Sequence, residues 1–295
     1  YGTTYGQHGH GGRIDSNLIT NSFSYNMYAY YTDVSSISHN RILARQYDGY
    51  NYFYGIYTYY CNVDSVVGNY IDAYRDYIAN THNPIRLNYC NYGTYTNNPK
   101  KVCIVANNEL RSKGLNGYVY GLYVGYGNFK VYHNSVYVDC PYNYSYCIYA
   151  YTDSGYLIDI RNNNVFLFGT GANAYPIYAN SSSKTLVQFS HNNIYRPSGN
   201  IAYVGAALAN LKAFQAYDVD ASSVYPEFLD FSKDMSQFKL ADGVNVLYKK
   251  NETNGLFQLT FNYNYGIADN PAGNYAEAAE KYGTLYFSLS MPRPT

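Results

Sequence analysis

The chain has 295 residues, and its 20 Lys and Arg balance its 20 Asp and Glu, so the formal net charge is zero. Only 14% of the residues are charged, whereas 43 are Tyr and none is Trp. Nucleic-acid-binding proteins carry basic patches, and no basic run occurs here, so we expect no nucleic-acid partner. No stretch approaches the ~18 consecutive apolar residues of a transmembrane helix, so we expect no membrane span.

One short pattern recurs seven times before residue 200: an apolar residue, two residues of any type, Asn, one residue of any type, and a second apolar residue. The first copy is Ile14, Asn17 and Ile19. The remaining copies are centred on Asn40, Asn69, Asn108, Asn134, Asn163 and Asn192. Successive Asn are 23 to 39 residues apart, most often 29. A repeat of this length predicts a solenoid in which each copy belongs to one coil.

A second apolar strip precedes most of these copies and comprises Met27, Ile56, Ile85, Leu122, Ile148 and Ile177. Residues two positions later are mostly small or apolar, and this alternation indicates strands with one buried face. Coils of short strands, stacked about 4.8 Å apart, bury a continuous core. The sequence therefore predicts an all-β fold, a right-handed parallel β-helix solenoid of about seven or eight coils.

The Asn column has a physical explanation in such a solenoid. Asn tolerates the left-handed backbone of turns, and its amide can bond to the Asn of the next coil. We therefore predict a structural ladder of Asn17, Asn40, Asn69, Asn108, Asn134, Asn163 and Asn192. The longest spacing, before Asn108, predicts an inserted loop around residues 91–101, because solenoid insertions emerge as loops on one face.

The pattern changes after residue 200. Leu208, Leu211 and Phe214 are three residues apart, which predicts a short helix over Ala207–Ala216. We assign residues 1–200 to the coils, and residues 201–250 to a terminal coil and cap that contains this helix, since a solenoid must cover its last open core. Residues 251–295 form an irregular tail or a junction to a further domain.

Several segments resemble a known family. The Asn-centred units, the runs Tyr54–Tyr60 and Tyr132–Val138, and the closing segment from His191 to Phe228 resemble the pectin-lyase-like repeat proteins. These are secreted bacterial right-handed β-helix proteins, often embedded in very large surface polypeptides. The resemblance spans about residues 14–250. It implies the fold and an extracellular or cell-surface location, but not one activity, because that superfamily includes lyases, hydrolases, adhesins and spacers.

No group of residues points to catalysis, a metal or a cofactor, and we predict none of them. His39, His133 and His191 share one column, but they lie on the second, fifth and seventh coils, too far apart to converge on one ion. We interpret them as turn residues. Asp72 and Asp76, with Arg75 between them, form the only local charged group, which we place in a solvated turn.

The five Cys allow two possible disulfides. Cys61 and Cys90 fall in one column of adjacent coils, and the stacking distance of about 4.8 Å lies within the disulfide window. Cys140 and Cys147 bracket a short loop and can also pair, which leaves Cys103 over. Buried, reduced thiols stacked in a column are equally consistent with this spacing.

Tyrosine marks the candidate ligand-binding surface. The residue after each strip residue is Tyr28, Tyr57, Arg86, Tyr123, Tyr149 or Tyr178. The residue two positions before it is Tyr25, Tyr54, Asn83, Tyr120, Tyr146 or Tyr175. Stacked Tyr would form an aromatic surface with hydroxyl tips that suits sugar rings or a protein partner. The structural alternative is that Tyr, which has high β propensity, only stabilises the sheet.

The leading functional hypothesis is a non-enzymatic extracellular module, an adhesin or a surface or filament component, within a larger polypeptide or assembly. Its partners would be polysaccharide or neighbouring subunits, bound by Tyr28, Tyr57, Tyr123, Tyr149 and Tyr178. A neutral face favours neutral sugars over polyuronates. The alternative hypothesis is a polysaccharide lyase or glycoside hydrolase of the pectin-lyase-like superfamily, which a carboxylate pair, or an Arg beside an Asp, would favour. A third is a purely structural filament segment.

Overall fold

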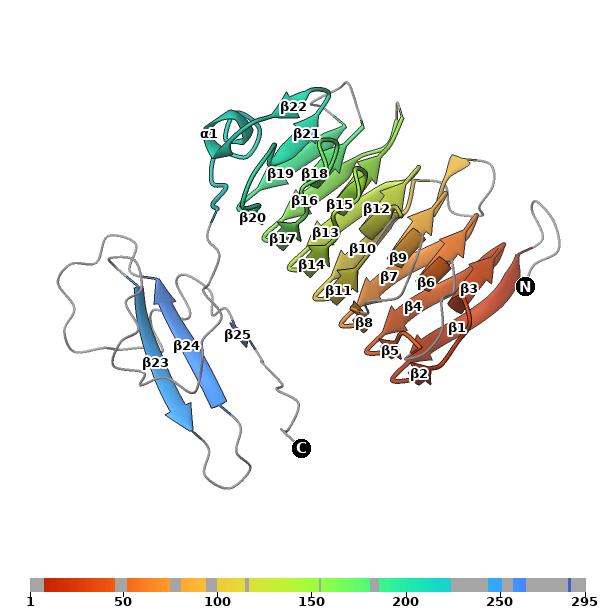
Figure 1. The fold of residues 1–295 in the computed structure, drawn as a ribbon. Coiled ribbons are helices and arrows are strands. Elements are labelled where there is room, and N and C mark those ends of the chain that lie inside the picture. Colours follow the sequence, from red (N-terminus) through yellow and green to blue (C-terminus); the bar gives the residue numbers. More distant parts are fainter. Residues whose placement is uncertain are drawn as a thin grey trace. The chain divides into compact units, whose positions relative to one another are not determined.

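The structure is a computed structural model that describes residues 8–45, 52–74, 81–93, 100–114, 117–153, 155–180, 186–223, 244–250, 257–263 and 286–287. The chain divides into two compact units, Tyr1–Tyr225 and Pro226–Thr295. The first unit is a parallel β-solenoid in which each coil adds one strand to each of three sheets (Figure 1). The predicted all-β solenoid is therefore confirmed.

Each sheet takes its strands from successive coils. Sheet 1 contains β1 (Gly9–Asp15), β4 (Thr32–Ser38), β7 (Asn62–Val67), β10 (Val102–Ala106), β13 (Asn128–Tyr132), β16 (Ile158–Arg161) and β19 (Val187–Ser190). Sheet 2 contains β2 (Leu18–Thr20), β5 (Arg41–Leu43), β8 (Tyr70–Tyr74), β11 (Glu109–Lys113), β14 (Ser135–Asp139), β17 (Asn164–Phe168) and β20 (Asn193–Tyr195). Sheet 3 contains β3 (Tyr25–Tyr30), β6 (Tyr52–Tyr59), β9 (Thr81–Asn88), β12 (Val119–Gly125), β15 (Ser145–Tyr151), β18 (Tyr175–Ala179), β21 (Ala202–Val204) and β22 (Ala207–Leu208).

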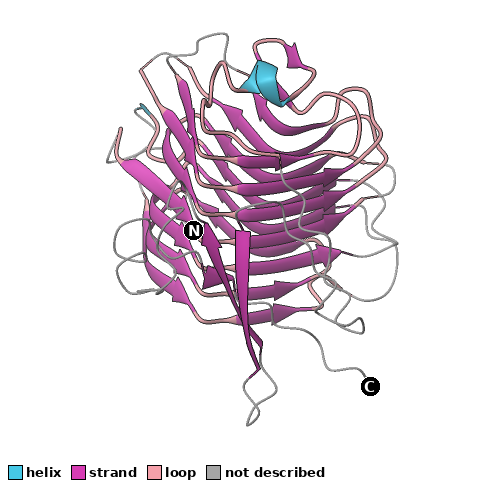
Figure 2. Cartoon of the chain, turned by 90° about the vertical axis from the view of Figure 1, so that its left-hand side faces the viewer, coloured by secondary structure: helices cyan, strands magenta, loops and turns pink. Residues whose placement is uncertain are grey.

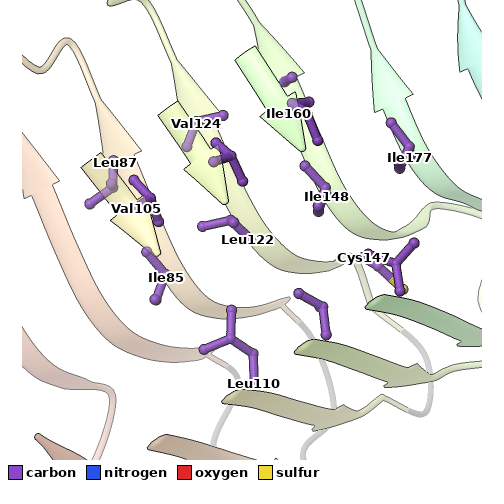
Figure 3. Close-up of a cluster of buried hydrophobic side chains, with 14 of the residues drawn as sticks. Ile85, Leu87, Val105, Leu110, Leu122, Val124, Cys147, Ile148, Ile160 and Ile177 are labelled. Carbon is purple, nitrogen blue, oxygen red and sulfur yellow. The ribbon is translucent and has the colours of Figure 1, made fainter. Parts of the chain in front are cut away.

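The strand register places equivalent residues of neighbouring coils side by side. In sheet 3 the strip residues pair in one column, from Met27 with Ile56 through to Ile177 with Ala202. Figure 3 shows Ile85, Leu122, Ile148 and Ile177 as a row inside the stack, and all four are fully buried. The apolar residues on either side of the ladder Asn form the corresponding columns of sheets 1 and 2. Each such side chain contributes about 1.5–3 kcal/mol when it is fully buried.

The last coil is closed by a short segment with its own polar contacts. Helix α1 (Leu211–Phe214) lies at the end of the stack in Figure 2, and the side chain of Asn210 caps it by accepting from Ala213 N at 3.0 Å. The predicted helix over Ala207–Ala216 is thus shorter. Residues Ala207–Leu208 instead form β22, which pairs antiparallel with β21. Phe214 supplies the fully buried side chain of this helix.

A buried arginine ties two loops of the terminal coils together. Arg196 is only 7% exposed, and among the described residues no carboxylate pairs with it. Its guanidinium donates instead to backbone carbonyl oxygens, those of Gly169, Gly171, Ala174 and Asn200. Five N–H donors in a fixed planar fork allow one side chain to satisfy this many acceptors.

The second unit is described only through its strands. Strand β23 (Val244–Lys250) pairs antiparallel with β24 (Phe257–Tyr263), and β24 also pairs with β25 (Tyr286–Phe287). The boundary between the two units lies near residue 225, and β23 and β24 both belong to the second unit. The predicted division into coils, a cap and a tail stays a prediction. In the part of the chain that the structure describes, no helix has the length and apolarity needed to span a bilayer.

Candidate binding surface

The outer face of sheet 3 carries three columns of side chains in register, and we call this surface the tyrosine face. The first column contains Tyr28, Tyr57, Arg86, Tyr123, Tyr149, Tyr178 and Tyr203. The second contains Tyr25, Tyr54, Asn83, Tyr120, Tyr146 and Tyr175. The third contains Tyr30, Tyr59, Asn88, Gly125 and Tyr151. The five predicted ligand-binding tyrosines therefore lie in one column.

From Tyr123 to Tyr203, the rings of the first column stack on one another along the solenoid. Neighbouring centroids lie 5.1 Å apart for Tyr123 and Tyr149, 4.9 Å for Tyr149 and Tyr178, and 4.5 Å for Tyr178 and Tyr203. These planes differ by only 7° to 12°. Tyr123, which lies between Arg86 and Tyr149, is only 9% exposed, whereas Tyr28 in β3 is 39% exposed. Solvent therefore meets mainly ring edges and hydroxyl groups.

The second column reaches the outer face because each strand has a break in its alternation. Tyr54 and the buried Ile56 are two residues apart and would normally point to the same side. The ladder pairing is interrupted between them at Gly55, where a Cβ would collide with the carbonyl oxygen of Pro84. Gly121 occupies the same position in β12, next to Cys147 O. The break turns Tyr54 outward while Ile56 stays in the core.

A further tyrosine ladder, which was not predicted from the sequence, lies at the corner between sheets 3 and 1. Its members are Tyr31, Tyr60, Tyr89 and Tyr126, all with φ between 46° and 53°. A left-handed backbone is uncommon for bulky residues and costs roughly 1–2 kcal/mol each. The rings stack at 5.3, 4.8 and 4.3 Å, which offsets part of this cost. The sequence contains a pattern that could have predicted this ladder, because each of these Tyr follows its strip residue by four positions.

The predicted inserted loop emerges at this same corner. Asn91 O accepts a hydrogen bond from Lys100 N at 2.9 Å, which closes the base of the loop, and residues 94–99 lie outside the described residues. Tyr92 donates through its hydroxyl to Asp153 at 2.6 Å and stacks on Tyr156 at 4.7 Å. The loop base therefore extends the aromatic surface beside the corner ladder.

Three hydroxyl groups of the tyrosine face have a raised pKa. Burial raises the pKa of Tyr57, Tyr120 and Tyr178 to about 12 in each case. Each neutral hydroxyl can both donate and accept a hydrogen bond. Arg86 is the only Asp, Glu, Lys or Arg in the strands of sheet 3. The face is thus a neutral, hydroxyl-bearing surface with one cation.

The predicted asparagine ladder is present in the structure. In every link, Nδ2 of one Asn donates to Oδ1 of the Asn on the next coil, at 2.8 to 3.0 Å. The backbone N–H of the same Asn donates to the same oxygen, at 2.9 to 3.1 Å. Asn40 to Asn192 are at most 1% exposed, whereas Asn17 on the first coil is exposed.

The left-handed backbone lies one residue before each ladder Asn, so its assignment to the Asn itself was wrong. These seven preceding residues have φ between 52° and 69°: Ser16, His39, Gly68, Asn107, His133, Asn162 and His191. A left-handed residue at this point redirects the chain, so that the following Asn side chain enters the coil interior. The prediction that His39, His133 and His191 are turn residues is confirmed.

Neither possible disulfide forms, and all five Cys are free and buried. The thiols point to separate partners in the core: Cys61 to Tyr59 O at 3.3 Å, Cys90 to Thr58 Oγ1 at 3.0 Å, Cys140 to Gly117 O at 3.7 Å, and Cys147 to Phe166 O at 3.3 Å. Burial raises the pKa of Cys61 to about 11 and the pKa values of Cys90, Cys103 and Cys147 further. These thiols are therefore unreactive core residues.

A separate charged cluster lies on the outer face of sheet 2. Asp72 pairs in register with Arg111, whose Cζ lies 5.4 Å from the centroid of Tyr74. Partial burial raises the pKa of Glu109, two residues before Arg111, and the Arg111 charge opposes this shift. Arg75 and Asp76, the rest of the predicted charged group, lie outside the described residues. Among the described residues, no three His, Cys, Asp or Glu side chains are placed to hold a metal ion.

Comparisons with protein-family models, curated proteins and solved structures give no significant match to this chain. Its class therefore rests on its own structure: an all-β parallel β-solenoid with an internal asparagine ladder and a tyrosine-rich outer face. The resemblance to pectin-lyase-like proteins extends to this fold. The superfamily, the secreted bacterial origin and the cell-surface location stay predictions.

Proposed function

We propose that this chain is a non-catalytic, extracellular or cell-surface β-solenoid module that binds glycan through the tyrosine face. The main observation behind this proposal is the register of the first column, in which six Tyr from six coils each pair with a Tyr of an adjacent coil. Stacked rings such as Tyr149 and Tyr178 present their hydroxyls at intervals near the strand spacing of about 4.8 Å. A sugar chain laid along the solenoid would meet a repeating row of donors and acceptors.

The rigidity of this surface supports binding. The tyrosines sit on strands that are hydrogen-bonded to both neighbouring coils, and their rings are held by stacking. A preformed array loses little conformational entropy when a ligand binds. Tyr also combines an apolar ring edge with a polar tip, which suits the mixed surface of a sugar. A neighbouring protein subunit is the other partner that such a face could accept.

The test is a glycan-array screen of the wild-type chain against a triple variant, Tyr57→Phe, Tyr149→Phe and Tyr178→Phe. These substitutions remove hydroxyls and keep the stacked rings, so the fold should persist, as circular dichroism would verify. We expect the signal to fall at least about tenfold, because several hydrogen bonds are lost together. The matched control is Tyr70→Phe, Tyr137→Phe and Tyr195→Phe on sheet 2. An array without any signal for the wild type, or equal signals for wild type and triple variant, would refute the proposal.

A second candidate function has its own observation. Arg111 lies beside Asp72 in register, with Glu109 on the same strand face, and glycoside cleavage requires paired acidic groups. This arrangement favours a polysaccharide lyase or hydrolase that acts on sheet 2. Release of reducing ends or unsaturated products from an array glycan, lost in Asp72→Asn, would establish it.

A further inference from the structure

Strand β9 interrupts all three columns of the tyrosine face with polar residues. Its residues at the register positions of the three columns are Asn83, Arg86 and Asn88, whereas the neighbouring strand β6 has Tyr54, Tyr57 and Tyr59 at these positions. On the other side, β12 continues the first two columns with Tyr120 and Tyr123. The face therefore has one polar notch, which lies between aromatic coils on either side.

The notch contains buried polar atoms that have no hydrogen-bond partner in the described part of the chain. They are Nδ2 of Asn83, Nε of Arg86 and Oδ1 of Asn88. Asn83 is fully buried and Asn88 is 7% exposed. An unpaired buried polar group costs about 1–3 kcal/mol, so three of them on one strand require an explanation. These atoms are buried in the free chain, so a ligand reaches Nδ2 of Asn83 and Nε of Arg86 only when the side chains around them move aside, and it then supplies their acceptors.

The environment of Arg86 is suited to an anionic ligand. Its Cζ lies 4.3 Å from the centroid of Tyr123 and 5.7 Å from that of Tyr57, and these rings hold the guanidinium in place. Nη1 lies 3.4 Å from Oδ1 of Asn83, a long hydrogen bond that braces the same group. Among the described residues no carboxylate forms an ion pair with Arg86. A carboxylate or sulfate matches the planar donor fork of an unpaired Arg.

We propose that Arg86, positioned by Asn83, binds a single anionic group, a carboxylate or a sulfate ester, on an otherwise neutral glycan. This inference rests on the proposed glycan-binding function and names the ligand class for it. Only one anionic group is accommodated, because the strands of sheet 3 contain no second Lys or Arg. A polyanion would place its other charges over neutral rings without compensation, at a desolvation cost. The expectation that this face suits neutral sugars better than polyuronates stays a prediction, and the present inference adds one anionic group to it.

Three monosaccharide probes share a glucose-type ring and differ in charge. They are methyl glucoside, which is neutral, the methyl glycoside of glucuronic acid, which carries a free carboxylate, and glucose 6-sulfate. Each is titrated into the isotope-labelled chain while the Arg Nε–Hε and Tyr ring signals are followed by NMR. The Arg86 signal is the one that disappears in Arg86→Gln. We expect it to shift with the glucuronide or the sulfate, with an affinity at least about tenfold above that of the glucoside. Comparing the two acidic probes distinguishes carboxylate from sulfate.

Two further variants, Arg86→Lys and Arg41→Gln, are compared with Arg86→Gln. Arg86→Lys keeps the charge and loses the planar fork, so it should retain only part of the preference, while Arg86→Gln should abolish it. Arg41→Gln is the matched control, since Arg41 also lies over a ring, 5.4 Å from that of Tyr70, but on sheet 2. Equal affinity for all three probes, or an unchanged preference in Arg86→Gln, would overturn the inference while the Tyr shifts still supported glycan binding. No shift of any Tyr or Arg signal would overturn both proposals.

Discussion

The carboxylate of Asp218 terminates the asparagine ladder at Asn192. Its Oδ2 accepts from the backbone N of Asn192 at 3.0 Å and from Nδ2 at 2.8 Å, and its Oδ1 accepts from His191 N at 2.8 Å. Every earlier Asn donates to the Asn of the following coil, so the last Asn needs an acceptor of another kind. A carboxylate has two acceptor oxygens and no donor, and it replaces the missing Asn in this fully buried position.

Replacing Asp218 with Asn should destabilise the solenoid although the two side chains have nearly the same shape. One acceptor oxygen becomes an NH₂ group that faces N–H donors of His191 or Asn192. We expect the free energy of unfolding to fall by about 1–3 kcal/mol, measured by urea denaturation. The control is Asp220→Asn. Asp220 also lies near His191, 3.4 Å from its Nε2, but its side chain is exposed. Equal stability of the Asp218 variant and the wild type would contradict this role.

Arg196→Met should be more damaging than the loss of an exposed arginine. The substitution leaves four carbonyl oxygens, those of Gly169, Gly171, Ala174 and Asn200, without the donor that satisfies them. We expect a loss of about 3 kcal/mol or more in the free energy of unfolding. Arg41→Met, at an exposed site over Tyr70, should cost less than about 1 kcal/mol. Similar losses in both variants would rule out a special role for Arg196.

Three half-buried tyrosines, Tyr57, Tyr120 and Tyr178, should make the fold sensitive to strongly alkaline pH. The pKa values of Tyr57, Tyr120 and Tyr178 are raised from 10.0 to about 12, so the folded state keeps these protons longer than the unfolded state. Their stabilising effect is complete below about pH 10 and is lost as the pH rises towards 12. Urea denaturation at a series of pH values measures this decline. Phenolate absorbance that is complete near pH 10 in the folded protein would contradict it.

All five thiols should be protected in the folded chain. Burial raises the pKa of Cys61 to about 11, and it raises the pKa values of Cys90, Cys103 and Cys147 further. A thiol-specific chromogenic reagent at pH 8 should therefore react slowly with native protein and with five thiols per chain in denaturant. A reducing agent should leave the unfolding midpoint unchanged. A lower midpoint under reducing conditions would show that a disulfide exists.

Periodicity alone determined the solenoid, its three core columns and the ladder residues. Ile14, Asn17 and Ile19 recur with one spacing pattern because stacked coils impose the same environment at equivalent positions. The outward column from Tyr28 to Tyr178 followed from the same alternation. Such features depend on local spacing and on one neighbouring coil, and a repeat makes both visible in the sequence.

The tertiary structure alone decided which polar groups find partners. Only the end of the stack makes Asp218 the last acceptor for Asn192. The spacing of Cys61 and Cys90 allowed a disulfide, but side-chain direction in the core gives each thiol its own oxygen partner. Arg86 looked like a gap in a Tyr column and became a cation between two rings. Pairing depends on direction and on burial in three dimensions, and residue spacing along the chain encodes neither.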